Sequence, residues 1–205
     1  MNRILKEKLI LRGISVSLDN VLDNSKAASG GERDVSFLKY LVDSKLLVCS
    51  EAILKRTSTA INQDYYNERY KKMHTESDRH YICRVAIQEE LFKLGIETLH
   101  GMDMGNMNIL RSSSNYDIIT VDLSTIIDIG LTPARNYFRG LTDINVKSYL
   151  ITTYFDDYMD DIIFYVFSRS NDDNYLNALK DYEDCYKMYV HGTEPSFNEY
   201  TTDKV

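Results

Sequence analysis

The residues best suited to chemistry in this sequence are an aspartate and a lysine in two strand-like runs. Asp117 stands among β-branched residues in YDIITVDL (116–123). In the later run, Asp143, Asn145 and Lys147 follow at two-residue spacing, so in a strand they would point the same way. If the two strands are neighbours, their oxygen atoms could hold Mg²⁺, which activates water, and the ammonium group could stabilise the charge that develops on a phosphodiester.

A further carboxylate lies on a predicted helix. Apolar residues recur at helical spacing over residues 77–94, and Gly95 follows as a C-terminal cap. In projection, Glu90 falls inside the apolar arc between Cys83 and Ala86. A carboxylate facing a core is costly unless it is paired or bound to a metal, so Glu90 is a candidate ligand. The alternative is a glutamate at the edge of the arc whose carboxylate reaches water.

Together these segments resemble the core of the PD-(D/E)XK, or restriction-endonuclease-like, nucleases. The likeness rests on a helix with a glutamate, followed by the strands GIETL, YDIITVD and INVK, and it covers residues 77–168. It implies that Asp117 binds metal, that Lys147 is the catalytic lysine and that Glu90 is the helix carboxylate. Asn145 would complete the metal site where the family usually has an acid, and a neutral amide would bind metal more weakly. The resemblance implies a Mg²⁺-dependent nuclease-like protein acting on nucleic-acid phosphodiesters, as in restriction or phage conflict.

The overall charge limits how nucleic acid could bind. With 31 acidic against 24 basic side chains, the net charge is −7. The chain therefore repels phosphate backbones at a distance, and binding needs a local basic patch. The most basic stretch is 62–80, where the cations Arg69, Lys71, Lys72 and Arg79 alternate with tyrosines that could stack on bases. The alternative is a solvated helix that joins two halves of the domain.

A second class of function stays open, a non-enzymatic subunit of a larger complex or a homo-oligomer. The sequence has 16 tyrosines, which suit protein interfaces because each ring buries a large area at low entropy cost. It has no phosphate loop and no GxSxG or HExxH motif. Three widely spaced cysteines without a CxxC pattern indicate a reducing, cytoplasmic location, and no apolar run is long enough to span a membrane.

The elements that must position these residues predict an α/β (α+β) fold, with a central mixed β-sheet flanked by helices and an N-terminal helical region. We expect one or two helices over 34–56, a helix over 77–94, strands over 96–101, 116–121, 144–155 and 161–168, and a closing helix over 171–190. Residues 123–140, broken by Pro133, are expected as a helical insertion. The predicted organisation is a mainly helical region over 1–75, an α/β core domain over 76–190 and a polar tail over 191–205.

Overall fold

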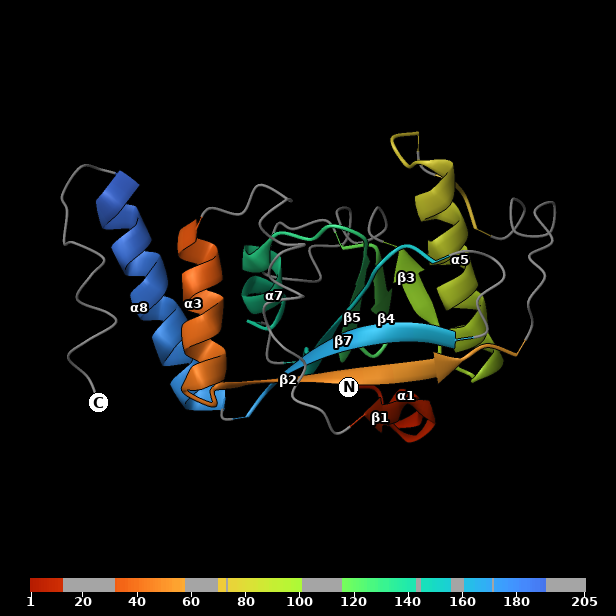
Figure 1. The fold of residues 1–205 in the computed structure, drawn as a ribbon, viewed down its shortest axis with the longest axis horizontal. Helices are drawn as coiled ribbons and strands as arrows, with labels where there is room; N and C mark the ends of the chain where they lie inside the picture. Colours follow the sequence, from red (N-terminus) through yellow and green to blue (C-terminus); the bar gives the residue numbers. More distant parts are fainter. Residues whose placement is uncertain are drawn as a thin grey trace.

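The computed structural model describes residues 1–12, 32–57, 70–72, 74–100, 116–142, 145–155, 161–170 and 172–190. Five helices and seven strands lie in these ranges (Figure 1), and the expected tail over 191–205 lies outside them. The helices are α1 (Arg3–Lys8), α3 (Glu32–Asp43), α5 (Asp78–Lys93), α7 (Ala134–Gly140) and α8 (Asp172–Val190). The strands are β1 (Ile10–Arg12), β2 (Leu47–Lys55), β3 (Thr98–His100), β4 (Ile118–Thr120), β5 (Thr125–Ile129), β6 (Ser148–Thr152) and β7 (Asp161–Arg169).

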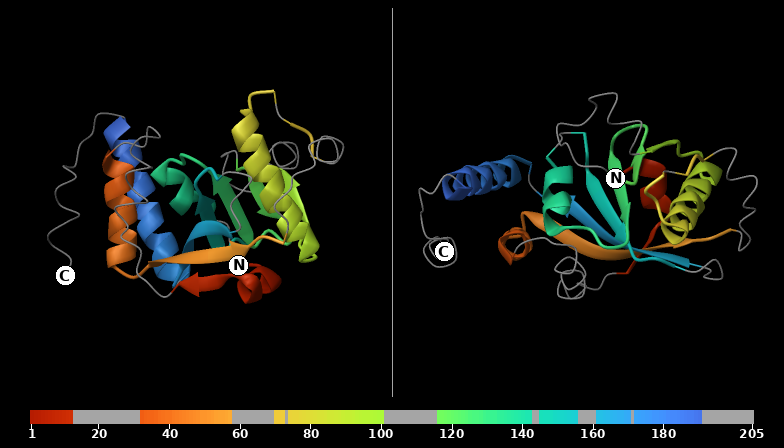
Figure 2. Two further views of the ribbon diagram at one scale, coloured as in Figure 1. Left: turned by 45° about the vertical axis from the view of Figure 1, so that its right-hand side comes forward. Right: turned by 90° about the horizontal axis from the view of Figure 1, so that it is seen from above.

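The strands form one mixed sheet in the order β1-β2-β7-β6-β5-β4-β3. Only the β5–β6 pair is parallel among the pairs of this sheet, and the others are antiparallel. One core cluster packs α1 and α5 against one face of the sheet, and another packs α3, α7 and α8 against the opposite face. Figure 2 shows α3 and α8 side by side at one end of the molecule and α5 at the other. The expected α/β class with a mixed central sheet is confirmed.

The segment that positions the candidate site runs from α5 to β6. Strands β3, β4 and β5 form an antiparallel meander, and α7 then connects β5 to the parallel strand β6. The expectation of a helical insertion over 123–140 is wrong for its first half, because TIIDI (125–129) is a fully buried strand. A run of β-branched residues buried on both faces favours a central strand. The helix in this segment begins only after Pro133, which lies at the N-cap of α7.

The N-terminal region also contributes to the sheet. The helix expected near residue 34 is α3, but a second helix over 44–56 is wrong, since β2 pairs with β7 along its whole length. Lys45 has a φ of 57°, and the Leu46 N–H donates to the Leu41 carbonyl oxygen, so the chain turns sharply after α3. Leu47 and Ile53, which fit a helical spacing, therefore lie on one face of a strand instead.

Helix α5 matches the expected helix over 77–94. The Ser77 side chain caps its N-terminus by accepting from the His80 N–H, and Gly95 follows its C-terminus with a φ of 75°. Its buried surface is wide and includes the polar residues Arg84, Gln88, Glu89 and Glu90. Among the helices in the described ranges, none has the length and apolar character needed to cross a membrane.

Candidate functional site

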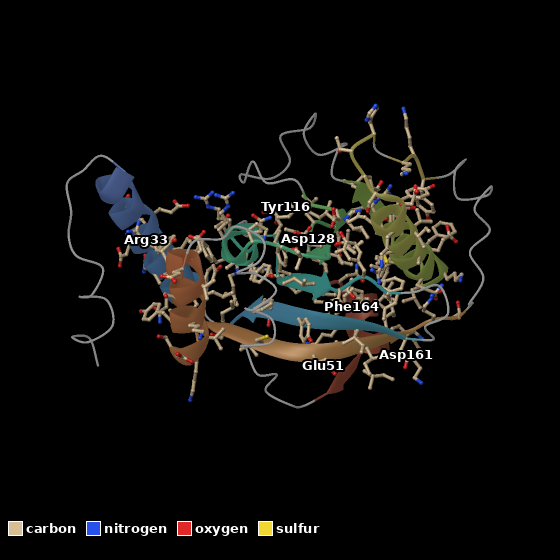
Figure 3. The ribbon with its side chains drawn as sticks, turned by 45° about the horizontal axis from the view of Figure 1, so that its top comes forward. Arg33, Glu51, Tyr116, Asp128, Asp161 and Phe164 are labelled. Carbon is tan, nitrogen blue, oxygen red and sulfur yellow. The ribbon has the colours of Figure 1, made fainter. Side chains whose placement is uncertain are left out.

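Two carboxylates lie side by side where β4 begins and β5 ends. Asp117 immediately precedes β4, and the register that pairs Ile118 with Ile127 brings it next to Asp128. The Asp117 N–H donates to Oδ1 of Asp128 at 3.0 Å, and the Ile129 N–H donates to Oδ2 of Asp117 at 2.8 Å. Figure 3 shows Asp128 near the middle of the molecule, in the region between α7 and α5. The antiparallel register thus holds both acids at the C-terminal end of β5.

Asp128 is the more deeply buried acid of this pair. It is only 4% exposed, and the Tyr149 hydroxyl donates to its Oδ2. Burial raises the pKa of Asp128, and the neighbouring Asp117 carboxylate raises it further, to about 7. Carboxyl groups that exchange a proton near neutral pH are common at functional sites.

His80, in the first turn of α5, bridges two carboxylates. Its Nε2 lies 3.0 Å from Oδ2 of Asp117, and its Nδ1 lies 2.7 Å from Oε1 of Glu76. Burial lowers the pKa of His80, but hydrogen bonds to Asp117 and Glu76 and their negative charges outweigh burial and raise it to about 9. His80 is therefore an imidazolium at neutral pH, and it donates from both ring nitrogens.

Arg84 continues this arrangement one helical turn further along α5. It is 1% exposed and donates to both Glu76 oxygens, from Nε at 2.8 Å and from Nη2 at 2.9 Å. Its Nη1 donates to Oε1 of Gln88 at 2.9 Å. Arg84, Glu76, His80 and Asp117 thus form a row of alternating charge, which we call the charge row. Each buried ion in it has an oppositely charged neighbour, as burial requires.

An aromatic ring lies near the two acids, at the end of the sheet where β5 and β6 terminate. Tyr154 follows the end of β6 and keeps 37% of its surface exposed. Its ring centroid lies 6.1 Å from that of His80 and 5.4 Å from the Arg79 guanidinium carbon. Gly130 follows β5 with a φ of 88°, and a Cβ there would lie 2.7 Å from Cζ of Tyr154. The ring therefore rests directly on the Gly130 backbone.

The structure does not bring Lys147 or Asn145 to Asp117. Strand β5 lies between β4 and β6, so the expectation that their strands are neighbours is wrong. Asp128 pairs with Ile151, and Lys147 lies four residues before Ile151, about 13 Å along the strand. The Lys147 N–H donates to the Ser124 carbonyl oxygen at 2.8 Å, at the opposite end of β5. Both Asn145 and Lys147 are exposed, and Asp143 lies outside the described residues.

Glu90 is buried as expected, but it belongs to a different set of contacts. Its Oε2 accepts from the Thr57 N–H at 3.1 Å and from the Thr57 hydroxyl at 2.9 Å, and its Oε1 pairs with Lys93 at 2.9 Å. It stands ten residues after His80, about 15 Å along α5 at ~1.5 Å per residue. Its pairing accounts for its burial, and it does not join Asp117.

The expected basic patch is described only in part. Lys71, Lys72 and Arg79 are exposed next to the start of α5, whereas Arg69 lies outside the described residues. Lys72 pairs with Asp78, and Arg79 stacks over Tyr154. The Lys71 carbonyl oxygen accepts from Nη2 of Arg84 at 3.1 Å, which ties this segment to the charge row.

Sequence reasoning missed Asp128, His80 and Glu76 as site residues. Asp128 interrupts a run of isoleucines, which signals a carboxylate on a buried strand once that run is assigned to the sheet. Glu76, His80 and Arg84 follow at four-residue spacing, so Glu76, just before the N-cap of α5, lies on the same side as the cations His80 and Arg84 on the helix. Both signals are present in the sequence.

The side chains at this site that could donate to a metal are the Asp117 and Asp128 carboxylates. Among the residues the structure describes, no group of three or more His, Cys, Asp or Glu side chains is placed to hold a metal. Mg²⁺, however, is often bound by only one or two carboxylates and keeps several waters. Asp117 and Asp128 offer such oxygens, and a buried acid next to a second acid would be stabilised by a cation. Two carboxylates of this kind are oxygen donors of the type that Mg²⁺ takes, and they do not make up a full protein cage such as that of structural zinc.

No protein-family model, curated protein or solved structure matches this chain. The functional proposal therefore rests on the fold and on the contacts around Asp117 and Asp128.

Proposed function

We propose that this chain is a Mg²⁺-dependent, nuclease-like protein that acts on nucleic-acid phosphodiesters, of the kind that takes part in restriction or phage conflict. Asp117 and Asp128 would hold the metal. The observation that carries this proposal is the pair of carboxylates on adjacent strands, linked by the 3.0 Å hydrogen bond from the Asp117 N–H to Asp128 and bordered by an imidazolium. Two acidic groups with a nearby cation suit phosphodiester hydrolysis.

The order of elements supports the resemblance to PD-(D/E)XK nucleases but assigns part of the family's site to other residues of this chain. The helix, three-strand meander, helix and strand run as α5, β3, β4, β5, α7 and β6. Because β5 is the third strand, the middle acid of the motif falls on Asp128 instead of Asn145. The lysine position, two residues later, falls on Gly130. The proposed site therefore keeps the acids of the family pattern and lacks its lysine.

The residues around the acids would hold them in place. When bound, Mg²⁺ would supply an activated water and stabilise negative charge on the phosphate. The Tyr149 hydroxyl fixes Oδ2 of Asp128, and the Ile129 N–H fixes Oδ2 of Asp117. His80 donates to the same oxygen of Asp117, so it acts as a positioning residue and also supplies the positive charge that a lysine would bring.

The test is divalent-metal-dependent cleavage of plasmid and single-stranded DNA. We expect cleavage with Mg²⁺ and none with EDTA, and we expect Asp117→Ala and Asp128→Asn to abolish it. Lys147→Ala is the matched control because Lys147 is exposed at the other end of β5, so it should cleave like wild type. A wild-type protein that cleaves neither substrate, or an Asp117→Ala protein that cleaves normally, would contradict the proposal.

A second candidate is the non-enzymatic subunit of a larger complex. It is favoured by Gly130 at the lysine position and by the charge row, in which His80 and Arg84 already neutralise two acids. In that case the purified protein would cleave nothing with any divalent metal, and it would co-purify with a protein partner. A wild-type protein with metal-dependent cleavage that Asp117→Ala removes would exclude this alternative.

For either function we propose a reducing, cytoplasmic location. Cys49 and Cys83 are free thiols, and burial raises the pKa of Cys49 to about 12. Cys83 is fully buried. Neither thiol is suited to reaction, which agrees with cysteines that serve as small apolar residues.

A further inference from the structure

We infer that Tyr154 is a stacking platform for an unpaired base, so that the substrate of the site is single-stranded nucleic acid. This inference rests on the proposed function for the phosphodiester next to Asp117, but it concerns binding and does not require hydrolysis. The observations that carry it are the close contact between the Tyr154 ring and Gly130 and the positions of Arg79 and His80 next to the ring.

The Tyr154 ring lies in close contact with the backbone of Gly130. A Cβ at this position would approach Cζ, Oη and Cε2 of Tyr154 to 2.7, 2.8 and 3.0 Å. Since such distances are too short for non-bonded carbon atoms, only glycine lets the ring lie this close to the backbone. Gly130 also has a φ of 88°, which residues with a side chain rarely adopt. Both features make Gly130 necessary for the position of Tyr154.

The ring lies at the edge of the sheet that carries the acids. Gly130 directly follows β5, which carries Asp128, and its N–H donates to the Thr152 carbonyl oxygen of β6 at 2.8 Å. The His80 ring, whose centroid lies 6.1 Å from that of Tyr154, joins the two groups, because its Nε2 lies 3.0 Å from Oδ2 of Asp117. A base stacked on Tyr154 would therefore have its phosphate within reach of the proposed site.

Cationic side chains accompany the ring. The Arg79 guanidinium carbon lies over the ring, 5.4 Å from its centroid, and the His80 ring meets it edge-on. A base that stacks on this face would take the place of the guanidinium group, which could then pair with the phosphate. Arg79 is exposed and lies in the first turn of α5. An exposed aromatic ring next to an arginine is the combination with which proteins hold single strands, because the ring takes the base and the cation takes the phosphate.

Two properties favour a single strand over a duplex. A ring can stack fully only on a base whose face is free, and bases inside a duplex already stack on one another. The net charge of −7 also weakens attraction to the dense phosphates of a duplex, so that binding depends more on stacking.

The experiment is fluorescence anisotropy with a labelled oligothymidylate and with the corresponding thymidylate–adenylate duplex, in EDTA so that neither is cleaved. We expect tighter binding of the single strand. Tyr154→Ala should weaken it roughly 5- to 150-fold, equivalent to about 1–3 kcal/mol for one stacked base. Tyr154→Phe should bind like wild type because it keeps the ring. Tyr40→Ala is the matched control, since Tyr40 is 41% exposed but lies on α3, and it should not change binding.

Tyr154→Leu guards against a folding defect, because leucine keeps more of the apolar side chain than alanine does but has no aromatic face. It should fold, as judged by circular dichroism, and still bind weakly. The inference is overturned if the wild type binds no oligothymidylate, if duplex binds as tightly, or if Tyr154→Ala and Tyr154→Leu bind like wild type. Tyr154-dependent binding without metal-dependent cleavage would contradict the proposed function alone. Cleavage with Tyr154-independent binding would contradict this inference alone.

Discussion

Replacing Asp128 by asparagine should stabilise the protein at alkaline pH. The pKa of Asp128 is raised from 3.8 to about 7, first by burial and then by Asp117. The folded state thus binds more protons than the unfolded state between these values, and the free energy of unfolding must fall as pH rises through them. At about 1.4 kcal/mol per pH unit, the loss is about 4 kcal/mol in all, of which about 2 kcal/mol falls between pH 5 and pH 7.

An asparagine side chain at this position would keep the local hydrogen bonds while removing the charge. Its oxygen can accept from the Asp117 N–H, and its amide nitrogen can donate to the Tyr149 oxygen. We therefore expect Asp128→Asn to unfold at higher urea concentration than wild type at pH 8, with a smaller difference at pH 5. The measurement is urea unfolding at both pH values, followed by circular dichroism.

Asp122→Asn is the control, because the pKa of Asp122 is shifted in the opposite direction to that of Asp128. Burial raises the pKa of Asp122, but hydrogen bonds from Thr120, Ser124 and Asn2 outweigh burial and lower it overall. Loss of that carboxylate should leave stability at pH 8 unchanged or reduced. The reasoning on Asp128 is refuted if Asp128→Asn is less stable than wild type at pH 8, or if its advantage over wild type is no larger at pH 8 than at pH 5.

Three further substitutions test the charge row and the tyrosine platform. The pKa of His80 is about 9 in the folded protein, so its stabilising effect is complete below the ordinary pKa of 6.5 and is lost as pH rises toward 9. Between these two pH values His80→Gln should therefore lose less stability than wild type in thermal unfolding. Arg84→Ala leaves Glu76 buried without its bidentate partner and should cost about 3–5 kcal/mol in urea unfolding, whereas a cost below about 1 kcal/mol would contradict the row's burial. Gly130→Ala forces a strained φ and a contact with Tyr154, so it should cost about 1–3 kcal/mol and weaken oligothymidylate binding; a fully stable variant would contradict the close packing.

Local signals in the sequence were sufficient for the helix of the site. Ser77 at the N-cap, Gly95 after the C-terminus and the apolar spacing between them all act within a few residues, so α5 is predictable. The strand-like runs of β4, β6 and β7 are predictable for the same reason, because the signals lie within each run.

Strand order could not be read from the same signals. Whether Asp117 meets Lys147 or Asp128 depends on which strand lies next to β4, and that is decided by long-range pairing. The five residues of β5 are short, are buried on both faces and stand close to Pro133, so their apolar run does not distinguish a strand from part of a buried helix. When these residues are taken as part of a helical insertion, β4 and β6 become neighbours, and Asp117 is expected to meet Lys147 instead of Asp128.

The same ambiguity affected the segment after α3. Leu46, Leu47 and Ile53 fit a helical spacing, yet β2 uses Leu47 and Ile53 on one face of a strand. Pairing with β7 over nine positions outweighs the local preference, and such pairing depends on residues more than a hundred positions away.

The most direct test of the Asp117–Asp128 site is calorimetric titration of the wild-type protein with Mg²⁺ at pH 8, where Asp128 is largely ionised. One binding event is predicted, with affinity that falls below pH 7 as Asp128 takes up its proton, and with binding lost in Asp117→Asn and in Asp128→Asn. Folded wild-type protein that binds no Mg²⁺, or variants that bind it as tightly as wild type, would contradict the assignment of these two carboxylates as the functional centre.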